Sequence, residues 1–423
     1  MIKLLAVTPT HPEHINPRIF YINSIKKFHG LNIDIKIIWI VTHPNNLKSN
    51  LNSDDEIYYL ENFKDAYELL EFTKPDIYLA NITLEPINEA ISLGALYYKI
   101  PIVCFDHSFF PISNQTIFKR KKFSLFFANI LPSDDESNKK FFKRLTFYLS
   151  KISFLAKTKF KFSKNRKKFF QKLFYFINKI NYNILVNPYA EIYLVSGNYS
   201  VKNLTDMNKN IVNKIKIVGN PYWDEISQKI KNYQISPHKK IRILIITDSL
   251  FEHGYWTSFQ RDNFLINLIN YLKDEPNFIF DFKIHPTSES IKYYQRLINQ
   301  QKINSKVFQN ENLWNLSNNY ELFITYGYSQ IHFELAFSGR KTILLNSSIN
   351  LPFMPLVEEA IEIGTIKQLK NNKSLVTSII KFLNETEKNS KNHQIFSKYI
   401  LESDRNSSKE IVKIILDTLS KKK

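Results

Sequence analysis

Short apolar runs alternate with helix-like stretches along the first hundred residues of the chain. Strand-like runs occur at Lys3–Val7, Ile33–Val41, Asp76–Ala80 and Ile102–Phe105, and Leu84–Tyr98 carries apolar residues at helical spacing. Strands of a parallel sheet are buried on both faces, so they read as nearly continuous apolar runs, and helices cross between them. The pattern therefore predicts a parallel α/β sheet with helices on both faces.

The alternation resumes after an interruption. Strand-like runs at Glu191–Val195 and Ile215–Val218 precede a polar stretch, Gln228–Lys240, which contains Pro237 and is typical of a linker. A second series of strands and helices follows in chain order: Ile241–Thr247, Phe264–Leu272, Phe278–Ile284, Leu322–Thr325, Gln330–Phe337 and Thr342–Leu345. The segment Ser374–Leu419 is mostly helical in pattern and highly charged.

The length of 423 residues suits two domains, each large enough to bury a core of its own. We expect a first domain over residues 1–227, a second over 238–400 and a C-terminal helix over 401–423. Two sheets of this kind joined by a linker form a cleft at the carboxyl ends of their strands, where ligands of parallel sheets bind. The loops at those strand ends are therefore where we expect the chemistry.

Composition narrows the class of protein. Apolar residues make up 43% of the chain, which excludes a disordered protein, and the single cysteine, Cys104, excludes a disulfide framework or a cysteine zinc site. The apolar run Met1–Val7 is too short for a signal peptide, and no run of about 18 uncharged apolar residues occurs. We expect a cytoplasmic protein without a membrane-spanning helix.

The net charge of +19 is concentrated in one segment. Residues 119–179 contain 18 Lys or Arg against three acidic residues, a surplus of +15. Aromatic residues are interleaved with these cations, as in Phe118–Phe123, Phe141–Tyr148 and Lys167–Phe170. We interpret residues 118–185 as a basic helical insertion in the first domain.

Three interpretations of this insertion remain open. An interfacial helix on anionic lipid combines aromatic and cationic faces in this way, and we place it first. Single-stranded nucleic acid also binds mixed basic and aromatic surfaces, but no RNA-binding motif accompanies the segment, so we expect no nucleic-acid partner. The third interpretation is a helical hairpin packed on the protein itself.

The most specific local pattern is Leu322–Leu345. A strand ends at Thr325 and a loop leads into a helix that begins near Gln330. Gly327 in this loop permits a close backbone approach, the helix N-terminus favours an anion, and Ser329 supplies a hydroxyl. One turn on, Glu334 is a candidate acceptor for ribose hydroxyls. The alternative is that Ser329 only caps the helix and that Glu334 is a solvated helix residue.

Two histidines follow predicted strands. His285, between Lys283 and Pro286, ends the strand Phe278–Ile284 and could donate to a phosphate as that leaving group gains charge. The alternative is a strand-end histidine bound to local backbone. His107 follows Ile102–Phe105 and is a candidate base, oriented by Asp106, or part of a helix cap.

Two Gly-Asn turns and one further loop complete the candidates. Gly197-Asn198 and Gly219-Asn220 each follow an apolar strand, where they place backbone amides near the domain junction or serve as structural turns. After the strand Ile241–Thr247, the side chains of Asp248, Ser249 and His253 are secondary candidates of the same kind.

Together these motifs resemble those of GT-B enzymes. The segments that carry the likeness, in chain order, are Lys74–Asp76, Lys99–Val103, Ser196–Asn198, Val218–Pro221, Lys283–Pro286 and Gly327–Gln330 with Glu334. They resemble the CDP-glycerol glycerophosphotransferases and capsule-type transferases, and also the non-hydrolysing UDP-N-acetylglucosamine 2-epimerases. The likeness covers most of the chain outside the basic insertion, and it implies two Rossmann-like domains with parallel sheets facing across a cleft.

The epimerase pattern fits less well. Thr325–Gln330 stands where those enzymes carry Asp-Ser-Gly-Gly before a Gln-Glu-Glu helix, and Asn346–Ser348 stands where a Thr-Glu-Arg run would follow the next strand. We therefore predict a nucleotide-sugar-dependent glycosyltransferase, or a polyol-phosphate transferase, of surface polysaccharide biosynthesis. A 2-epimerase-like isomerase is the second hypothesis, and a non-catalytic basic protein that binds membrane or nucleic acid is the third.

The resemblance also implies roles for particular residues. His107 and His285 would be catalytic, with His107 as base and His285 stabilising the leaving phosphate. Residues after the penultimate strand would bind the nucleotide phosphates and ribose, which suggests Ser329, Gln330 and Glu334. Our further candidates for the donor site are Gly219, Asn220, Lys283, Pro286 and Gly327. We expect no cofactor besides the nucleotide-activated donor and catalysis without a bound metal. The acceptor would be a glycan or a lipid-linked glycan, reached from the cytoplasmic face of the membrane.

Overall fold

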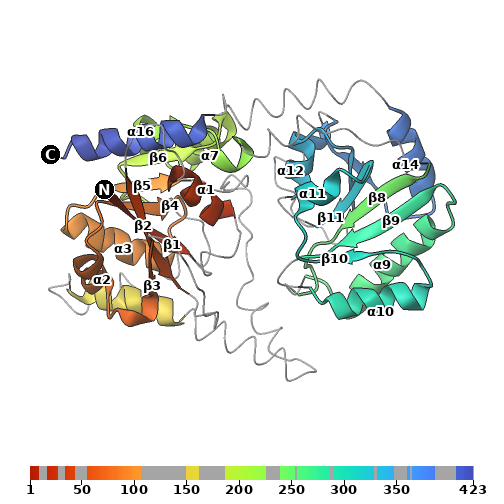
Figure 1. The fold of residues 1–423 in the computed structure, drawn as a ribbon, viewed down its shortest axis with the longest axis horizontal. Coiled ribbons are helices and arrows are strands. Elements are labelled where there is room, and N and C mark those ends of the chain that lie inside the picture. The colour runs from red at the N-terminus through yellow and green to blue at the C-terminus, as the bar shows by residue number, and fades with distance from the viewer. Residues whose placement is uncertain are drawn as a thin grey trace. The chain divides into compact units, whose positions relative to one another are not determined.

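The computed structural model describes most of the chain. The ranges that it describes are 1–8, 17–26, 34–42, 55–105, 149–161, 186–224, 239–252, 255–285, 289–327, 331–346, 360–362, 364–385 and 406–422. The chain divides into two compact units, one formed by Met1–Asp224 with Ile400–Lys423 and the other by Glu225–Tyr399. Each unit has its own sheet, covered by helices (Figure 1).

The sheet of the first unit has seven strands in the order β3-β2-β1-β4-β5-β6-β7, and every pair is parallel. Its strands in chain order are β1 (Ile2–Thr8), β2 (Ile35–Val41), β3 (Glu56–Tyr59), β4 (Ile77–Asn81), β5 (Ile102–Phe105), β6 (Ile192–Val195) and β7 (Ile215–Ile217). The order places β1 and β4 at the centre, where apolar runs such as Leu4–Val7 are buried on both faces.

Helices cover both faces of this sheet. On one face lie α1 (Pro17–Lys26) and the C-terminal helix α16 (Ser407–Ser420), whose Ile411, Val412 and Ile415 are fully or almost fully buried against the same cluster as α1. The other face carries α2 (Ala66–Thr73), α3 (Pro86–Tyr97), α7 (Asn198–Met207) and the helix at residues 149–161. Two 3-10 turns, η1 (Leu60–Asn62) and η2 (Lys209–Lys214), complete the unit.

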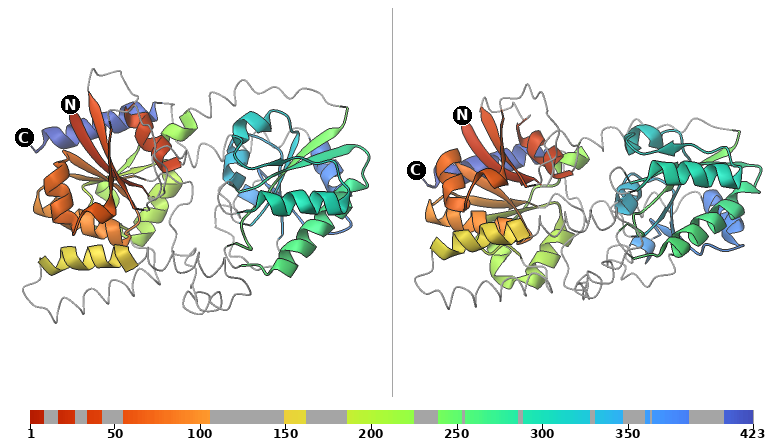
Figure 2. Two further views of the ribbon diagram at one scale, coloured as in Figure 1. Left: turned by 60° about the horizontal axis from the view of Figure 1, so that its bottom comes forward. Right: turned by 90° about the horizontal axis from the view of Figure 1, so that it is seen from below.

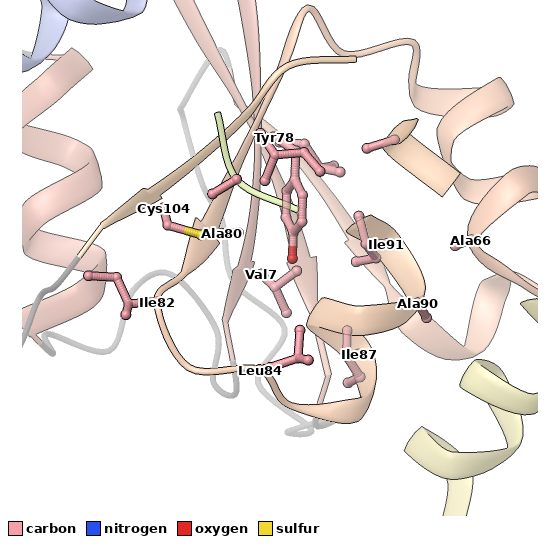
Figure 3. Close-up of a cluster of buried hydrophobic side chains, with 14 of the residues drawn as sticks. Val7, Ala66, Tyr78, Ala80, Ile82, Leu84, Ile87, Ala90, Ile91 and Cys104 are labelled. Carbon is pink, nitrogen blue, oxygen red and sulfur yellow. The ribbon is translucent and has the colours of Figure 1, made fainter. Parts of the chain in front are cut away.

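Figure 3 shows part of the core beneath α3. Tyr78 points from β4 among Val7, Ile87 and Ile91, and its ring is fully buried. Its hydroxyl donates to the Asn88 side chain at 2.9 Å, so the polar end of the ring is satisfied inside the core. At this point the core therefore consists of packed apolar side chains, and the hydroxyl of Tyr78 has a hydrogen-bond partner.

The helix at residues 149–161 is the described part of the basic insertion, and it packs on α2 and α3 (Figure 2). Its Phe154 and Leu155 are buried in the core of the first unit. Thr158 accepts a hydrogen bond from the backbone N–H of Ala66 at 3.0 Å, at the start of α2. This stretch therefore belongs to the body of the unit, as the packed-helix interpretation requires.

Two lysines of the same helix are paired with nearly buried acids. Lys159 contacts Glu89 at 2.9 Å, and Lys161 contacts Asp65 at 2.8 Å. Lys161 also lies over the Tyr67 ring, 5.3 Å from its centroid. The side chain of Lys161 is 55% exposed, so its ion pair contributes little to stability, whereas burial of Phe154 and Leu155 removes apolar surface from water. The remainder of the insertion, residues 118–148 and 162–185, lies outside the described part of the chain, and its predicted membrane contact stays a prediction.

The second unit contains a parallel sheet of six strands in the order β10-β9-β8-β11-β12-β13. Its strands are β8 (Ile241–Ile246), β9 (Phe278–Lys283), β10 (Val307–Phe308), β11 (Leu322–Tyr326), β12 (Thr342–Leu345) and β13 (Lys367–Leu369). Its helices are α9 (Ser258–Lys273), α10 (Ile291–Gln301), α11 (Leu313–Ser317), α12 (Ile331–Phe337) and α14 (Leu375–Asn384). Buried residues of α9, α10 and α14 share one apolar cluster, and α11 and α12 pack in another.

The α/β class with two parallel, Rossmann-like sheets is confirmed. The strands β3, β10 and β13 were not predicted, because short outer strands are less buried and carry a weak apolar signal. The predicted linker Gln228–Lys240 falls almost wholly outside the described residues. Among the helices that the structure describes, none has the length and apolar character to cross a bilayer.

Burial of the helix at 149–161 can be tested with two leucines. Leu155 is fully buried and Leu149 is 55% exposed. We expect Leu155→Ala to destabilise the first unit by about 2–5 kcal/mol, since it leaves a cavity. Leu149→Ala should change stability by less than about 0.5 kcal/mol. Denaturant unfolding of both variants measures the difference, and equal effects would contradict the docked helix.

Candidate functional site

Three neighbouring strands of the second sheet end side by side. β8 pairs with β9 and with β11, and Ile246 is opposite both Lys283 and Thr325. Because all three strands are parallel, the residues that follow them meet at one edge. That edge brings together three predicted candidates: Asp248 after β8, His285 after β9 and Gly327 after β11.

A buried carboxylate joins two of these loops. Glu289 is 6% exposed and accepts hydrogen bonds from the Thr247 hydroxyl, the backbone N–H of His285 at 2.6 Å and the Tyr294 hydroxyl. Burial raises the pKa of Glu289, and the three donors act against that rise. The carboxylate therefore ties the end of β8 to the end of β9 and to α10.

The backbone of His285 is held on both sides. Its N–H donates to Glu289, and its carbonyl oxygen accepts from Gln309 Nε2 at 3.3 Å. The same Gln309 amide donates to the carbonyl of Glu289 at 2.9 Å. These contacts use backbone atoms of His285, whose side chain is half-buried. The position of this histidine is thus fixed by its neighbours, and its predicted catalytic role stays a prediction.

Lys283 lies beneath this loop. Its ammonium group donates to the carbonyl oxygens of Gln309 at 2.8 Å and Ile284 at 3.2 Å, and the side chain is 9% exposed. Burial lowers the pKa of Lys283, while Glu311 and Glu289 act to raise it. Two of its three N–H groups are therefore used to join β9 to the residues after β10.

Position 327 requires a glycine for two reasons, its backbone conformation and the lack of space for a side chain. Its φ is +84°, and a Cβ atom at this position would lie 2.1 Å from Oδ2 of Asp248. The predicted close approach at Gly327 is thus made in this structure by the carboxylate of Asp248, from the loop after β8. Any larger residue would displace that carboxylate or the turn itself.

His332 holds the same turn from α12 and was not among the predicted residues. Its Nε2 lies 3.2 Å from the carbonyl oxygen of Gly327, and the side chain is fully buried. Burial lowers the pKa of His332 to about 4, so the imidazole is neutral at pH 7. Since a carbonyl can only accept, Nε2 carries the proton. Nδ1 has no hydrogen-bond partner within the described part of the chain.

Of the other predicted residues in the second unit, two are buried and four lie outside the described part of the chain. Glu334 is 7% exposed, so the alternative of a solvated helix residue is wrong. Ser249 is fully buried, and its hydroxyl has no partner among the residues that the structure describes. His253, Pro286, Ser329 and Gln330 lie outside those residues. Trp256 stacks on Tyr326 with ring centroids 5.5 Å apart, which packs the loop after β8 against β11.

In the first unit, the two Gly-Asn turns are adjacent. The N–H of Val218 donates to the carbonyl of Val195 at 2.9 Å, next to the point where each turn begins. Gly219 has φ +72°, and the buried Asn220 accepts from the N–H of Tyr222 at 3.0 Å, capping the helix at 221–224. The structural-turn interpretation therefore holds for Gly219-Asn220.

Polar atoms nevertheless remain unpaired at this edge. The side-chain N–H groups of Asn220 and the hydroxyl of Ser196 are buried without a hydrogen-bond partner among the described residues. Buried polar groups are usually paired, so such atoms are candidates for ligand contacts. His107 and Asp106 lie outside the described residues, and the role of His107 stays a prediction.

The contacts at the edge of the second unit depend on three residues that the sequence analysis did not predict: Glu289, Gln309 and His332. Glu289 follows His285 by four residues, a spacing that could have drawn attention to it. Gln309 follows a two-residue strand that the apolar pattern does not show. In the described ranges no three His, Cys, Asp or Glu residues gather in a way that could hold a metal ion.

Known structures with the same architecture show the fold. MnaA of S. aureus in complex with UDP superposes with a TM-score of 0.57 at 14% identity, covering 99% of this chain and 97% of that one. UDP-GlcNAc 2-epimerase from Neisseria meningitidis gives 0.55 at 17% identity, covering 99% and 100%. The wall teichoic acid polymerase TagF gives 0.53 at 12% identity, covering 100% and 89%.

These likenesses establish a GT-B fold for the chain. At identities of 12–17% they show the fold alone. No protein-family model matches the sequence, and no curated protein matches it either.

Replacement of Gly327 tests the contact with Asp248. We expect Gly327→Ala to destabilise the second unit by about 2–4 kcal/mol, from positive φ and from the clash with the carboxylate. In an Asp248→Ala background only the conformational part should remain, about 1–2 kcal/mol. Gly339→Ala is the matched control, because Gly339 has φ +69° and is exposed. Urea unfolding gives the coupling energy, and strict additivity would refute the contact.

The buried imidazole predicts a pH dependence. Because the pKa of His332 falls from 6.5 in the unfolded chain to about 4 in the folded one, its stabilising contribution is complete above pH 6.5. It is lost as pH falls toward 4, by up to about 3 kcal/mol. We expect His332→Gln to lose less stability than the wild type between pH 7 and pH 4.5. Parallel stability curves for the two proteins would show that His332 is not buried and neutral.

Proposed function

We propose that this GT-B chain is a nucleotide-sugar-dependent glycosyltransferase, or a polyol-phosphate transferase, of surface polysaccharide biosynthesis. The observation that carries the proposal is the edge where β8, β9 and β11 end, with His285 fixed from both sides by Glu289 and Gln309. A catalytic group must be held in place before the reaction, and backbone contacts of this kind do so without using the imidazole.

The fold neighbours support a nucleotide-linked substrate. In those structures MnaA is bound to UDP and the Neisseria meningitidis epimerase to UDP-GlcNAc, and TagF is a wall teichoic acid polymerase. Both classes of neighbour act on nucleotide-linked compounds, so the fold is compatible with a transferase and with an isomerase. The departures of Thr325–Gln330 and Asn346–Ser348 from the epimerase pattern favour the transferase.

In the proposed mechanism, the acceptor hydroxyl attacks the donor at its anomeric carbon, or at phosphorus for a polyol-phosphate donor. His107 would take the proton of that hydroxyl, and His285 would donate to the phosphate oxygen as it gains negative charge. Glu334, buried on α12, would accept hydrogen bonds from the ribose, and the Gly327–Gln330 turn would bind the nucleotide. We propose that these groups act without a bound metal.

Substitution of His285 tests the mechanism. We expect His285→Asn to lower the rate of nucleotide release from the donor by about 100-fold or more. Donor binding should be retained within a few-fold, because the hydrogen bonds from residue 285 to Glu289 and from Gln309 to residue 285 use backbone atoms, which the substitution keeps. Release is measured by chromatography over a panel of UDP-, CDP-, GDP- and CMP-linked donors with the purified full chain, and binding by calorimetry.

Other outcomes identify the competing hypotheses. Interconversion of a nucleotide sugar with no acceptor present would establish the isomerase. An unchanged rate in His285→Asn would remove this residue from the mechanism. If no donor or nucleotide binds, the proposed function is wrong and the basic insertion becomes the better guide to function.

A further inference from the structure

Two loops of the first unit lie side by side at the carboxyl edge of its sheet. Their strands β6 and β7 pair in parallel, and the backbone N–H of Val218 donates to the carbonyl oxygen of Val195 at 2.9 Å. Ser196 is the residue after Val195, and Asn220 is the second residue after Val218. Both loops belong to the described range 186–224. The side chains of Ser196 and Asn220 therefore come from adjacent loops.

Both side chains have a hydrogen-bond donor that the rest of the unit does not use. Ser196 is 2% exposed and Asn220 is 0% exposed. Neither the Ser196 hydroxyl nor the Asn220 amide nitrogen has a hydrogen-bond partner among the residues that the structure describes. The amide oxygen of Asn220 already accepts from the N–H of Tyr222 at 3.0 Å, so only the donor end of this amide remains. Since buried polar groups are usually paired, the two donors point to an oxygen atom of a ligand.

A helix begins at the same place. Ser196 is followed by Gly197, the N-cap of α7, and a glycine has no side chain with which to cap the helix. The N-terminus of a helix carries a partial positive charge and favours an anion, and α7 is ten residues long. Asn198, the first residue of α7, is exposed, so this end of the helix reaches the surface.

The charged residues of α7 and β7 are compatible with a bound anion. Lys202 lies one turn after Asn198 and is exposed, so its ammonium group adds positive charge near the start of α7. Lys216 on β7 is exposed as well. The one acidic residue of these two elements, Asp206, lies in the last turn of α7, away from Gly197.

One further carboxylate comes close to these loops, and it has a partner. Asp224 follows Asn220 by four residues, and its carboxylate accepts a hydrogen bond from the N–H of Ser407 at 2.8 Å, at the start of α16. The next charged residues of α16, Lys409 and Glu410, are exposed and opposite in sign. The surroundings therefore leave the donors of Ser196 and Asn220 without a nearby acceptor group of this unit.

We infer that the first unit binds an anionic group, a phosphate or a carboxylate, at the N-terminus of α7, with hydrogen bonds from Ser196 and Asn220. Oxygens of such groups accept strong hydrogen bonds from hydroxyl and amide donors. The nucleotide is assigned above to the Gly327 turn of the second unit. On the basis of the proposed function, the anionic group therefore belongs to the acceptor, which is an acidic glycan or an acidic lipid-linked glycan. Asn220, a donor-site candidate from the sequence, then contacts the acceptor.

Thermal unfolding of the full chain in different anions tests this site. Inorganic phosphate, acetate and chloride are compared at one ionic strength, because a bound anion stabilises the folded protein by mass action. We expect phosphate or acetate to raise the melting temperature above its value in chloride. Ser196→Ala should weaken the apparent affinity for that anion by about tenfold, the usual loss for one hydrogen bond to a charged group. In chloride this variant should be as stable as the wild type, because the hydroxyl has no partner to lose among the described residues.

Two further variants complete the comparison. Asn220→Asp keeps the oxygen that accepts from Tyr222 and replaces the amide donor with a negative charge, so the effect of the anion should disappear. Thr365→Val is the matched control for Ser196→Ala. Thr365 lies in the second unit, is 8% exposed and has a hydroxyl without a hydrogen-bond partner in the described ranges. Its replacement should leave the response to the anion unchanged.

Steady-state kinetics link the site to the acceptor. With a nucleotide-linked donor that the full chain uses, Ser196→Ala should raise the KM for an acidic acceptor by about tenfold. The KM for the donor should stay within a few-fold of the wild-type value. Equal use of acidic and neutral acceptors by the wild type would overturn the assignment of the anionic group to the acceptor.

The remaining outcomes separate this inference from the proposed function. A wild type that responds to neither phosphate nor acetate has no such site, and the inference is wrong. The same holds if Ser196→Ala and Asn220→Asp respond as the wild type does, because the anion then binds elsewhere. If the anion binds as expected but no nucleotide or donor does, the site stands, whereas the proposed function and the assignment to an acceptor fail.

Discussion

The buried carboxylate of Glu289 is the interaction on which the candidate site depends. A carboxylate is costly to bury, and this one is stabilised by hydrogen bonds from Thr247, His285 and Tyr294. Those donors come from the end of β8, the end of β9 and α10, so a single side chain fixes the relative position of three elements. Gln309 adds the residues after β10 to the same arrangement. The backbone of His285 is consequently held by hydrogen bonds on both sides, and its side chain is half-buried.

Much of the fold could be predicted from the sequence, because central parallel strands such as β1 and β11 are buried on both faces and leave continuous apolar runs. Short edge strands such as β10 leave no such trace, since two residues give no periodicity. The candidate edge was found because strand ends can be located from the runs. The contacts within this edge were not predicted, because the hydrogen bonds of Glu289 and His332 depend on which strands are neighbours. The periodicity of apolar residues does not give the order of strands in a sheet.

The basic insertion shows how composition alone can mislead. Lysines at 159 and 161 read as part of a cationic surface, yet each contacts an acid of the first unit, Glu89 and Asp65. The adjacent Phe154 and Leu155 enter the core. Net charge therefore overstates what the helix at 149–161 offers to a partner.

The position of α16 has a consequence for synthesis of the chain. Ile411, Val412 and Ile415 cover part of one face of the first sheet, together with α1, but they are made after the whole second unit, residues 225–399. During synthesis, the first unit therefore has part of an apolar face uncovered until the second unit has been made. The last helix then completes a domain that began several hundred residues earlier. In chain order, the second unit is one continuous segment placed near the end of the first, and the carboxylate of Asp224, just before that segment, accepts a hydrogen bond from the N–H of Ser407 at the start of α16.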